Sequence, residues 1–196
     1  MALLIARRSA RRHWLAMAFV LAAASAGVGA GAGASESQAS REYAVKAAFL
    51  LNFAQFVEWP AEAFASPDAP LRIGVLGEDP FAGALDATVA GETVREHPIE
   101  VERADDPHAL ADCHLVFVAA SEERRIDEVI AALGDRPILT VGDMEDFARR
   151  GGVLNFLIDE RKIRFAINPT AAKAGGLQIN AQLLNLAKLV DADHGR

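Results

Sequence analysis

A group of glycine and polar residues in the last third of the chain has the residue types of a small binding site. Gly151 and Gly152 precede an apolar segment that carries Asn155, and the next apolar segment carries Arg164 and ends at Asn168. Consecutive glycines permit a positive φ or a close approach to the backbone, and the arginine guanidinium suits a carboxylate. A buried asparagine must find hydrogen-bond partners. Two interpretations stay open: structural hydrogen bonding at a bulge or turn, or contact with a small ligand or a partner protein.

Patterns typical of catalysis are incomplete elsewhere in the chain. Gly74 and Gly77 lack the companion residues of a phosphate-binding loop, and Glu78 follows directly, where a phosphate would need positive charge. Ser121 is the only serine after residue 66. It lacks the flanking glycines of a nucleophile elbow, so we expect it to cap a helix. We therefore predict no catalytic residues, and we expect that the chain is not an enzyme.

Metal and thiol chemistry also lack the spacing that they need. The acids and histidines between residues 105 and 114 span a proline-bearing loop and a strand start, whereas metal ligands need a defined face. Cys113 is the only cysteine and cannot pair within the chain. Its apolar neighbours indicate a buried, inert thiol, not the open and electropositive setting of a reactive one. We expect neither a metal nor a cofactor.

The first 34 residues have the pattern of a cleaved secretory signal peptide. Four arginines precede an uncharged apolar run from Trp14 to about Ala26, and Ala32-Gly33-Ala34 closes a small-residue stretch. The apolar run is well short of the ~20 residues that span a bilayer. We predict cleavage after residue 34 and a single mature domain, 35–196, that works outside the cytoplasm.

The charge of the mature chain argues against nucleic-acid binding. The whole chain has 20 basic and 27 acidic side chains. Removing the four arginines of residues 1–34 leaves 16 basic against 27 acidic side chains, a net charge of −11. Such a surface repels phosphate backbones, so we expect no nucleic-acid partner.

The order of apolar segments predicts a mainly parallel sheet with helices on both faces. Apolar strand-like runs alternate with helical patterns until about residue 150, which is typical of an α/β fold. Two apolar segments then flank Asp159-Glu160-Arg161 and predict a C-terminal hairpin. The predicted strands are 71–77, 99–101, 115–119, 138–141, 153–158 and 162–168, and the predicted helices are 41–57, 79–89, 121–133, 144–150, 169–175 and 179–190.

The first predicted helix is apolar over more than one stripe. Phe49, Phe53 and Phe56 lie beside a second apolar line, and Trp59 follows the helix. A helix packed on one side of a sheet needs an apolar face of only about 100°. The surplus is covered either by a second intramolecular layer or by a partner protein. We expect at least one of these four aromatics to be substantially exposed and to contact a partner, since aromatics often dominate interfaces.

Six segments in a fixed order resemble the YfiR family of secreted bacterial regulators. The segments are VKAAFLLNFAQFVEWP, IGVLGEDPF, CHLVFVAASE, ILTVGDMEDFARRGGVLNF, IRFAIN and LQINAQLLNLAK, and they span residues 41–190. The resemblance implies a Rossmann-like α/β sandwich in the periplasm. It also implies a repressor that binds the periplasmic part of an inner-membrane diguanylate cyclase and that an outer-membrane lipoprotein can sequester. Cyclic di-GMP signalling, biofilm formation and motility would then be under its indirect control.

The chain departs from the founding members of the family in its cysteine content, and it also has an alternative function. Founding members carry disulfides, whereas this chain has Cys113 alone, so redox gating is not carried over. The alternative is a periplasmic small-molecule binding component of a signalling system, which would show a polar pocket near Asn155 and Arg164 lined by aromatics. A homodimer is a further possibility that the sequence leaves open.

Overall fold

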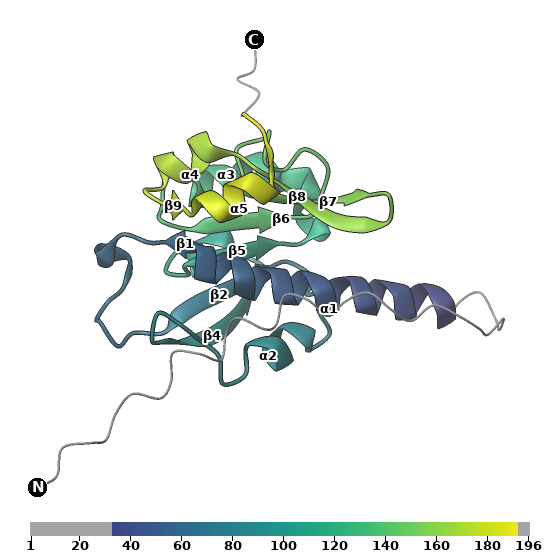
Figure 1. Cartoon of the computed structure of the whole chain (residues 1–196), viewed down its shortest axis with the longest axis horizontal. Coiled ribbons are helices and arrows are strands. Elements are labelled where there is room, and N and C mark those ends of the chain that lie inside the picture. Colours follow the sequence, from purple (N-terminus) through teal and green to yellow (C-terminus); the bar gives the residue numbers. More distant parts are fainter. Residues whose placement is uncertain (1–32, 192–196) are drawn as a thin grey trace, which may run out of the picture.

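The computed structural model of the chain describes residues 33–191 and is built around an eight-stranded sheet (Figure 1). The strands lie in the order β10-β8-β7-β6-β5-β2-β4-β3. From β4 through β2, β5 and β6 to β7 the neighbours are parallel, as are β10 and β8, whereas the β7–β8 and β3–β4 pairs are antiparallel. The expected α/β fold is therefore confirmed. The strands are β2 (Leu71–Leu76), β3 (Thr93–Val94), β4 (His97–Ala104), β5 (Leu115–Val118), β6 (Leu139–Gly142), β7 (Leu154–Asp159), β8 (Lys162–Ile167) and β10 (Lys188–Leu189), with a separate pair of β1 (Val57–Glu58) and β9 (Gln178–Ile179).

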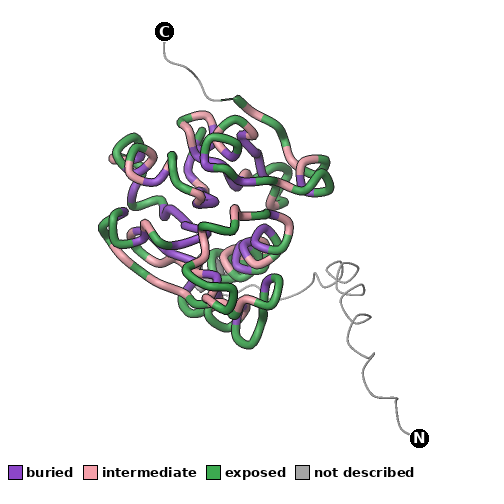
Figure 2. The backbone as a smooth tube through the Cα atoms, turned by 90° about the vertical axis from the view of Figure 1, so that its left-hand side faces the viewer, coloured by how far each residue is buried: buried purple, intermediate pink, exposed green. Residues whose placement is uncertain are grey.

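Helices cover both faces of the sheet, as expected. Leu115 and Phe117 of β5 join the core on the side of α1, α2 and α5, while Val116 and Val118 join the core on the side of α3. Successive side chains of a strand point to opposite faces, so a continuous apolar strand fits a sheet that is covered twice. Figure 2 shows the buried segments of the backbone inside the fold, with exposed segments around them. The helices are α1 (Gly33–Phe56), α2 (Ala84–Val89), α3 (Ile126–Leu133), α4 (Pro169–Ala174) and α5 (Ala181–Leu186).

The predicted C-terminal hairpin is formed by β7 and β8. Asp159 pairs with Lys162 across a two-residue turn. The turn residues Glu160 and Arg161 have φ values of 47° and 62°. Positive φ at both central residues is the geometry of a type I′ turn, whose twist matches that of the strands. The N-terminal half of α1 and the hairpin extend past the rest of the sheet on the same side of the molecule (Figure 1).

Three predicted helices need correction. Residues 144–150 form turns instead of a helix. Helix α2 begins only at Ala84, because Gly83 at its N-cap has a left-handed φ of 86°. The helix expected over 179–190 ends at Leu186, because the chain then becomes strand β10 and pairs with β8.

The predicted signal peptide, residues 1–34, lies almost wholly outside the described residues, and its cleavage stays a prediction. Helix α1 begins at Gly33, earlier than the predicted start at Arg41. Within residues 33–191, no helix is long and apolar enough to cross a membrane.

Candidate functional site

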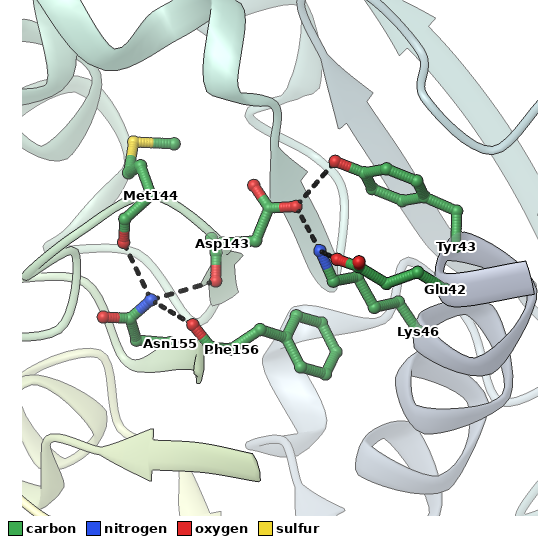
Figure 3. A network of polar contacts seen from close by, with 8 residues as sticks. Glu42, Tyr43, Lys46, Asp143, Met144, Asn155 and Phe156 are labelled. Atoms are coloured by element: carbon green, nitrogen blue, oxygen red, sulfur yellow. Dashed lines mark hydrogen bonds and ion pairs between the residues drawn. The ribbon is translucent and has the colours of Figure 1, made fainter. Parts of the chain in front are cut away.

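A polar cluster with a buried ion pair at its centre joins the middle of α1 to the carboxyl end of β6 (Figure 3). We name it the α1–β6 clasp; it consists of Glu42, Tyr43, Lys46 and Asp143. The ammonium Nζ of Lys46 lies 2.7 Å from Asp143 Oδ2 and 2.6 Å from Glu42 Oε1. The hydroxyl of Tyr43 donates to the same Asp143 oxygen at 2.9 Å. Tyr43 and Lys46 thus bind the same carboxylate oxygen of Asp143, which lies about 100 positions further along the chain.

The Lys46–Asp143 pair at the centre of the clasp is buried, with side chains 4% and 6% exposed. Lys46 is 3% exposed, and its ammonium also lies 4.3 Å from the centre of the Tyr43 ring. Burial, followed by the negative charge of Asp143, raises the pKa of Tyr43 above its usual value, so the phenol stays protonated and remains a donor. The second oxygen of Asp143, Oδ1, is buried and has no hydrogen-bond partner among the described residues.

This arrangement is better suited to holding α1 on the sheet than to catalysis. The charge of Lys46 is shared by two carboxylates, and the Tyr43 proton is held, so no group is poised for proton transfer. Removing one member of a buried ion pair leaves the other charge uncompensated, which costs several kcal/mol. The clasp therefore holds the middle of α1 against the sheet. The sequence contained a sign of it, because Lys46 interrupts an apolar line that continues at Leu50.

Asn155 and Asn168, two predicted site residues, are buried and have structural partners. The Asn155 amide donates to the carbonyls of Met144 and Phe156, each at 2.9 Å (Figure 3). Its bond to Met144 fixes the chain directly after Asp143. Asn168 caps α4 by accepting from the Ala171 amide, and it donates to the Ala148 carbonyl at 2.9 Å. Both amide groups therefore have internal uses.

The two glycines have separate structural reasons: the backbone conformation explains Gly151, and the packing of Phe147 explains Gly152. Gly151 has a left-handed φ of 107°, and a Cβ added to Gly152 would lie 2.2 Å from the Phe147 ring. The ring also lies against the backbone of Gly142. Because Phe147 is drawn onto these glycines and Asp146 takes a positive φ of 54°, the segment forms turns in place of the predicted helix.

Arg164 lies on the hairpin, as predicted. It takes no part in the hydrogen bonds of Asn155 and Asn168 given above. Its Cα partner is Leu157, and Asn155 pairs with Ala166, so Arg164 and Asn155 share one face of the hairpin. Arg164 is exposed, whereas Asn155 is 2% exposed and already bonded. A ligand role for Asn155, Arg164, Asn168, Gly151 and Gly152 stays a prediction.

The topological switch point of the sheet is filled by side chains. Strands β4 and β5 lie on opposite sides of β2, and ligands of open α/β sheets usually bind outside the carboxyl ends of such strands. Here a Cβ on Gly77 would lie 2.4 Å from Ser121 Oγ and 2.5 Å from Glu122 Oε1. Ser121 also accepts from the Glu78 amide, and Arg125 pairs with Glu122 at 2.6 Å. Ser121 thus lies inside a short 3-10 helix, Ala120–Arg125, and does not cap it as predicted.

The aromatic residues of α1 are more buried than predicted. Phe53 is fully buried, and Phe49, Phe56 and Trp59 are half-buried and pack against the core. The expectation of a substantially exposed aromatic is therefore wrong. The hairpin supplies the second layer, because Phe49 contacts Phe156 and Phe165 with ring centres 6.0 and 6.1 Å apart. Their role as partner contacts stays a prediction.

Two exposed apolar residues continue the contact between α1 and the hairpin outward. Val45 lies one turn before Phe49 on the same side of α1, and Ile158 lies two residues after Phe156 on the same face of β7. They are 42% and 59% exposed. We name Val45, Phe49 and Ile158 the α1–hairpin surface. The other large apolar residues that are exposed in the described chain are Leu186 and Leu189.

Cys113 is buried, as predicted, and is a free thiol. It is 4% exposed, and its sulfur lies against Gly74, where an added Cβ would be 3.1 Å away. Burial, and then the charge of Glu102, raise the pKa of Cys113 to about 12. The thiol is therefore protonated and unreactive at neutral pH.

Comparison with known proteins finds a matching family model and several solved structures that resemble part of the chain. A family model described as YfiR/HmsC-like matches residues 43–188. A conserved domain protein from Vibrio cholerae O1 biovar El Tor is 16% identical, with a TM-score of 0.49 over 61% of this chain and 54% of that chain. An ABC domain in complex with L-Trp from Streptococcus pneumonia is 12% identical, with a TM-score of 0.47 over 66% and 57%. The chain thus spans little more than half the length of either structure.

Proposed function

Because the chain belongs to the YfiR/HmsC-like family, we propose that it is a periplasmic regulator that binds the periplasmic part of an inner-membrane diguanylate cyclase and lowers cyclic di-GMP signalling. The family match carries the proposal, since residues 43–188 include nearly all of the described α/β domain. An outer-membrane lipoprotein that sequesters the regulator belongs to the same proposal.

The state of the polar groups supports a regulator over an enzyme. Active sites of α/β proteins usually lie at the carboxyl ends of the strands, and in this chain glycine, serine and acidic residues follow β2, β5 and β6. In this chain Ser121 and Glu122 occupy the space above Gly77, and Asp143 is held by Lys46 and Tyr43. These groups stabilise the fold and leave its surface to make the functional contacts.

The α1–hairpin surface is the part of the molecule that we propose contacts the cyclase. Val45 and Ile158 are exposed apolar residues on two elements that extend in the same direction (Figure 1). The half-buried Phe49, one helical turn after Val45, makes three ring contacts, with Phe53, Phe156 and Phe165. An aromatic held in place near exposed aliphatic residues is a suitable centre for a protein interface.

Cyclic di-GMP measured in the native host tests the regulatory role. Deleting the gene should raise the intracellular concentration of this nucleotide, and the chain expressed with residues 1–34 should restore it. The same chain without residues 1–34 should remain in the cytoplasm and fail to restore it. An unchanged concentration after deletion, under conditions in which the cyclase is expressed, would contradict the proposal.

A second candidate function is a periplasmic small-molecule binding component. It is favoured by a pocket of about 420 Å³ whose lining includes Arg72 and Arg136. This size falls within the range of small-molecule sites. The pocket lies at the amino ends of β2, β5 and β6, away from the predicted location near Asn155 and Arg164.

A further inference from the structure

The pocket at the amino ends of the strands has a mixed lining that a small organic anion would complement. Its apolar wall comes from small residues and prolines on three segments, and its polar groups lie at the start of β2 and directly before β5 and β6. The apolar lining residues are Ala63, Ala65, Ala69, Pro70, Ala111, Pro137 and Ile138.

Two arginines line this pocket, and they differ in what they already bind. Arg72 is engaged, because its Nε lies 3.4 Å from Glu102 and 3.8 Å from Glu100. Arg136 is exposed, and its guanidinium has no ion pair or hydrogen bond among the described residues. An unpaired guanidinium presents a planar set of donors that matches a carboxylate in two-point contact.

The histidine in the same wall is buried and is not open to a ligand. His114 is 4% exposed, and its Nδ1 accepts from the Arg72 amide at 3.0 Å. The neutral ring therefore carries its proton on Nε2. Nε2 is buried, and a hydrogen bond with the Ala63 backbone favours the protonated ring. The guanidinium of Arg136 is thus the unpaired donor among the lining side chains that a ligand can reach.

The charges at the rim limit the kind of anion. Arg72 is already paired with Glu100 and Glu102, and the acidic residues Glu62 and Asp112 also line the pocket. Arg136 is therefore the unpaired cation of the lining, and a dianion such as phosphate gains little. A single carboxylate can pair with Arg136, while an apolar body fits against the alanine and proline wall.

We propose that this pocket binds a monocarboxylate with a small apolar body, with the carboxylate on Arg136. The inference rests on the second candidate function and is independent of the cyclase, because it depends on the pocket and on the unpaired guanidinium of Arg136. Benzoate, butyrate and acetate are suitable probes, and benzamide, butyramide and acetamide are their uncharged controls.

Isothermal titration calorimetry of the exported protein with each probe tests the proposal. We expect benzoate to bind about tenfold more tightly than benzamide, the ratio that one charge-assisted contact supplies. Trp59 offers a second readout, because it is the only tryptophan after residue 34 and its indole donates to the His114 carbonyl at 2.9 Å. Its fluorescence should change with the same affinity.

Two arginine variants separate this pocket from general charge attraction. Arg136→Gln should weaken benzoate binding about tenfold and leave benzamide unchanged. Arg124→Gln is the matched control, because Arg124 is an exposed arginine that does not line the pocket, so its replacement should have no effect. The proposal is wrong if no carboxylate binds more tightly than its amide, if Arg136→Gln leaves benzoate binding unchanged, or if Arg124→Gln weakens it equally.

Discussion

Replacing Lys46 by methionine should destabilise the protein strongly through the α1–β6 clasp. Methionine keeps the length of the side chain but removes the charge, so Asp143 loses its ion pair. The Asp143 side chain is only 6% exposed and one of its oxygens already lacks a partner, so water cannot replace the ammonium. Glu42, whose side chain is 33% exposed, can turn to solvent at little cost.

The expected loss follows from the burial of Asp143. Breaking a buried ion pair on one side costs about 3–5 kcal/mol, which corresponds to a fall in Tm of roughly 10 °C for a chain of this size. The double variant Lys46→Met with Asp143→Leu removes both charges and should recover much of this loss, because no buried charge remains. Lys162→Met, which changes an exposed lysine at the start of β8, should shift Tm little.

Urea unfolding of wild type, Lys46→Met, Asp143→Leu and the double variant gives the free energies of unfolding for a double-mutant cycle, and Lys162→Met is measured beside them as the control. The reasoning is refuted if Lys46→Met costs no more than Lys162→Met. It is also refuted if the double variant is less stable than Lys46→Met by the full cost of Asp143→Leu alone, because the two side chains would then act independently.

Three further predictions concern pH, packing and the thiol. Burial lowers the pKa of His114 to about 4, below its usual 6.5, so between these pH values the unfolded chain binds a proton that the folded chain does not. The free energy of unfolding should therefore fall by about 3 kcal/mol as pH drops from 6.5 to 4. Thermal melts of wild type and His114→Gln should converge at low pH. Gly152→Ala would place a Cβ 2.2 Å from the Phe147 ring and should cost about 1–3 kcal/mol, and Phe147→Leu in the same chain should reduce that cost in urea unfolding. Cys113, with its pKa raised to about 12, should react with iodoacetamide at pH 8 only after denaturation, and rapid labelling of the folded protein would contradict its burial.

The sheet could be predicted because its central strands are short apolar runs in the sequence. The segment 115–119 is apolar at every position, and such a run is stable only when both faces of a strand are covered. The hairpin was predictable for a related reason, since two apolar segments flank three charged residues at 159–161. Local pattern and tertiary structure agree in both places.

The clasp and several element ends could not be predicted, because they depend on contacts between distant segments. Lys46 and Asp143 are 97 positions apart, and Asp143 on its own resembles an ordinary acid at a helix start. The 144–150 segment has helix-forming residues, but the packing of Phe147 overrides that preference. The buried asparagine at 155 was correctly expected to need partners, yet the sequence does not show that backbone carbonyls supply them.

Direct binding between the exported protein and the periplasmic part of the host's diguanylate cyclase tests the central proposal most directly. Ile158→Asp places a charge on the α1–hairpin surface, and Leu189→Asp does the same at a residue of similar exposure on β10, 59% against 56%. The regulatory account predicts that wild type and Leu189→Asp bind the immobilised cyclase domain, while Ile158→Asp loses binding at least tenfold, as burial of an unpaired charge requires, with an unchanged Tm. Absence of binding by the wild-type protein would contradict the regulatory role, and equal binding by all three proteins would contradict the α1–hairpin surface.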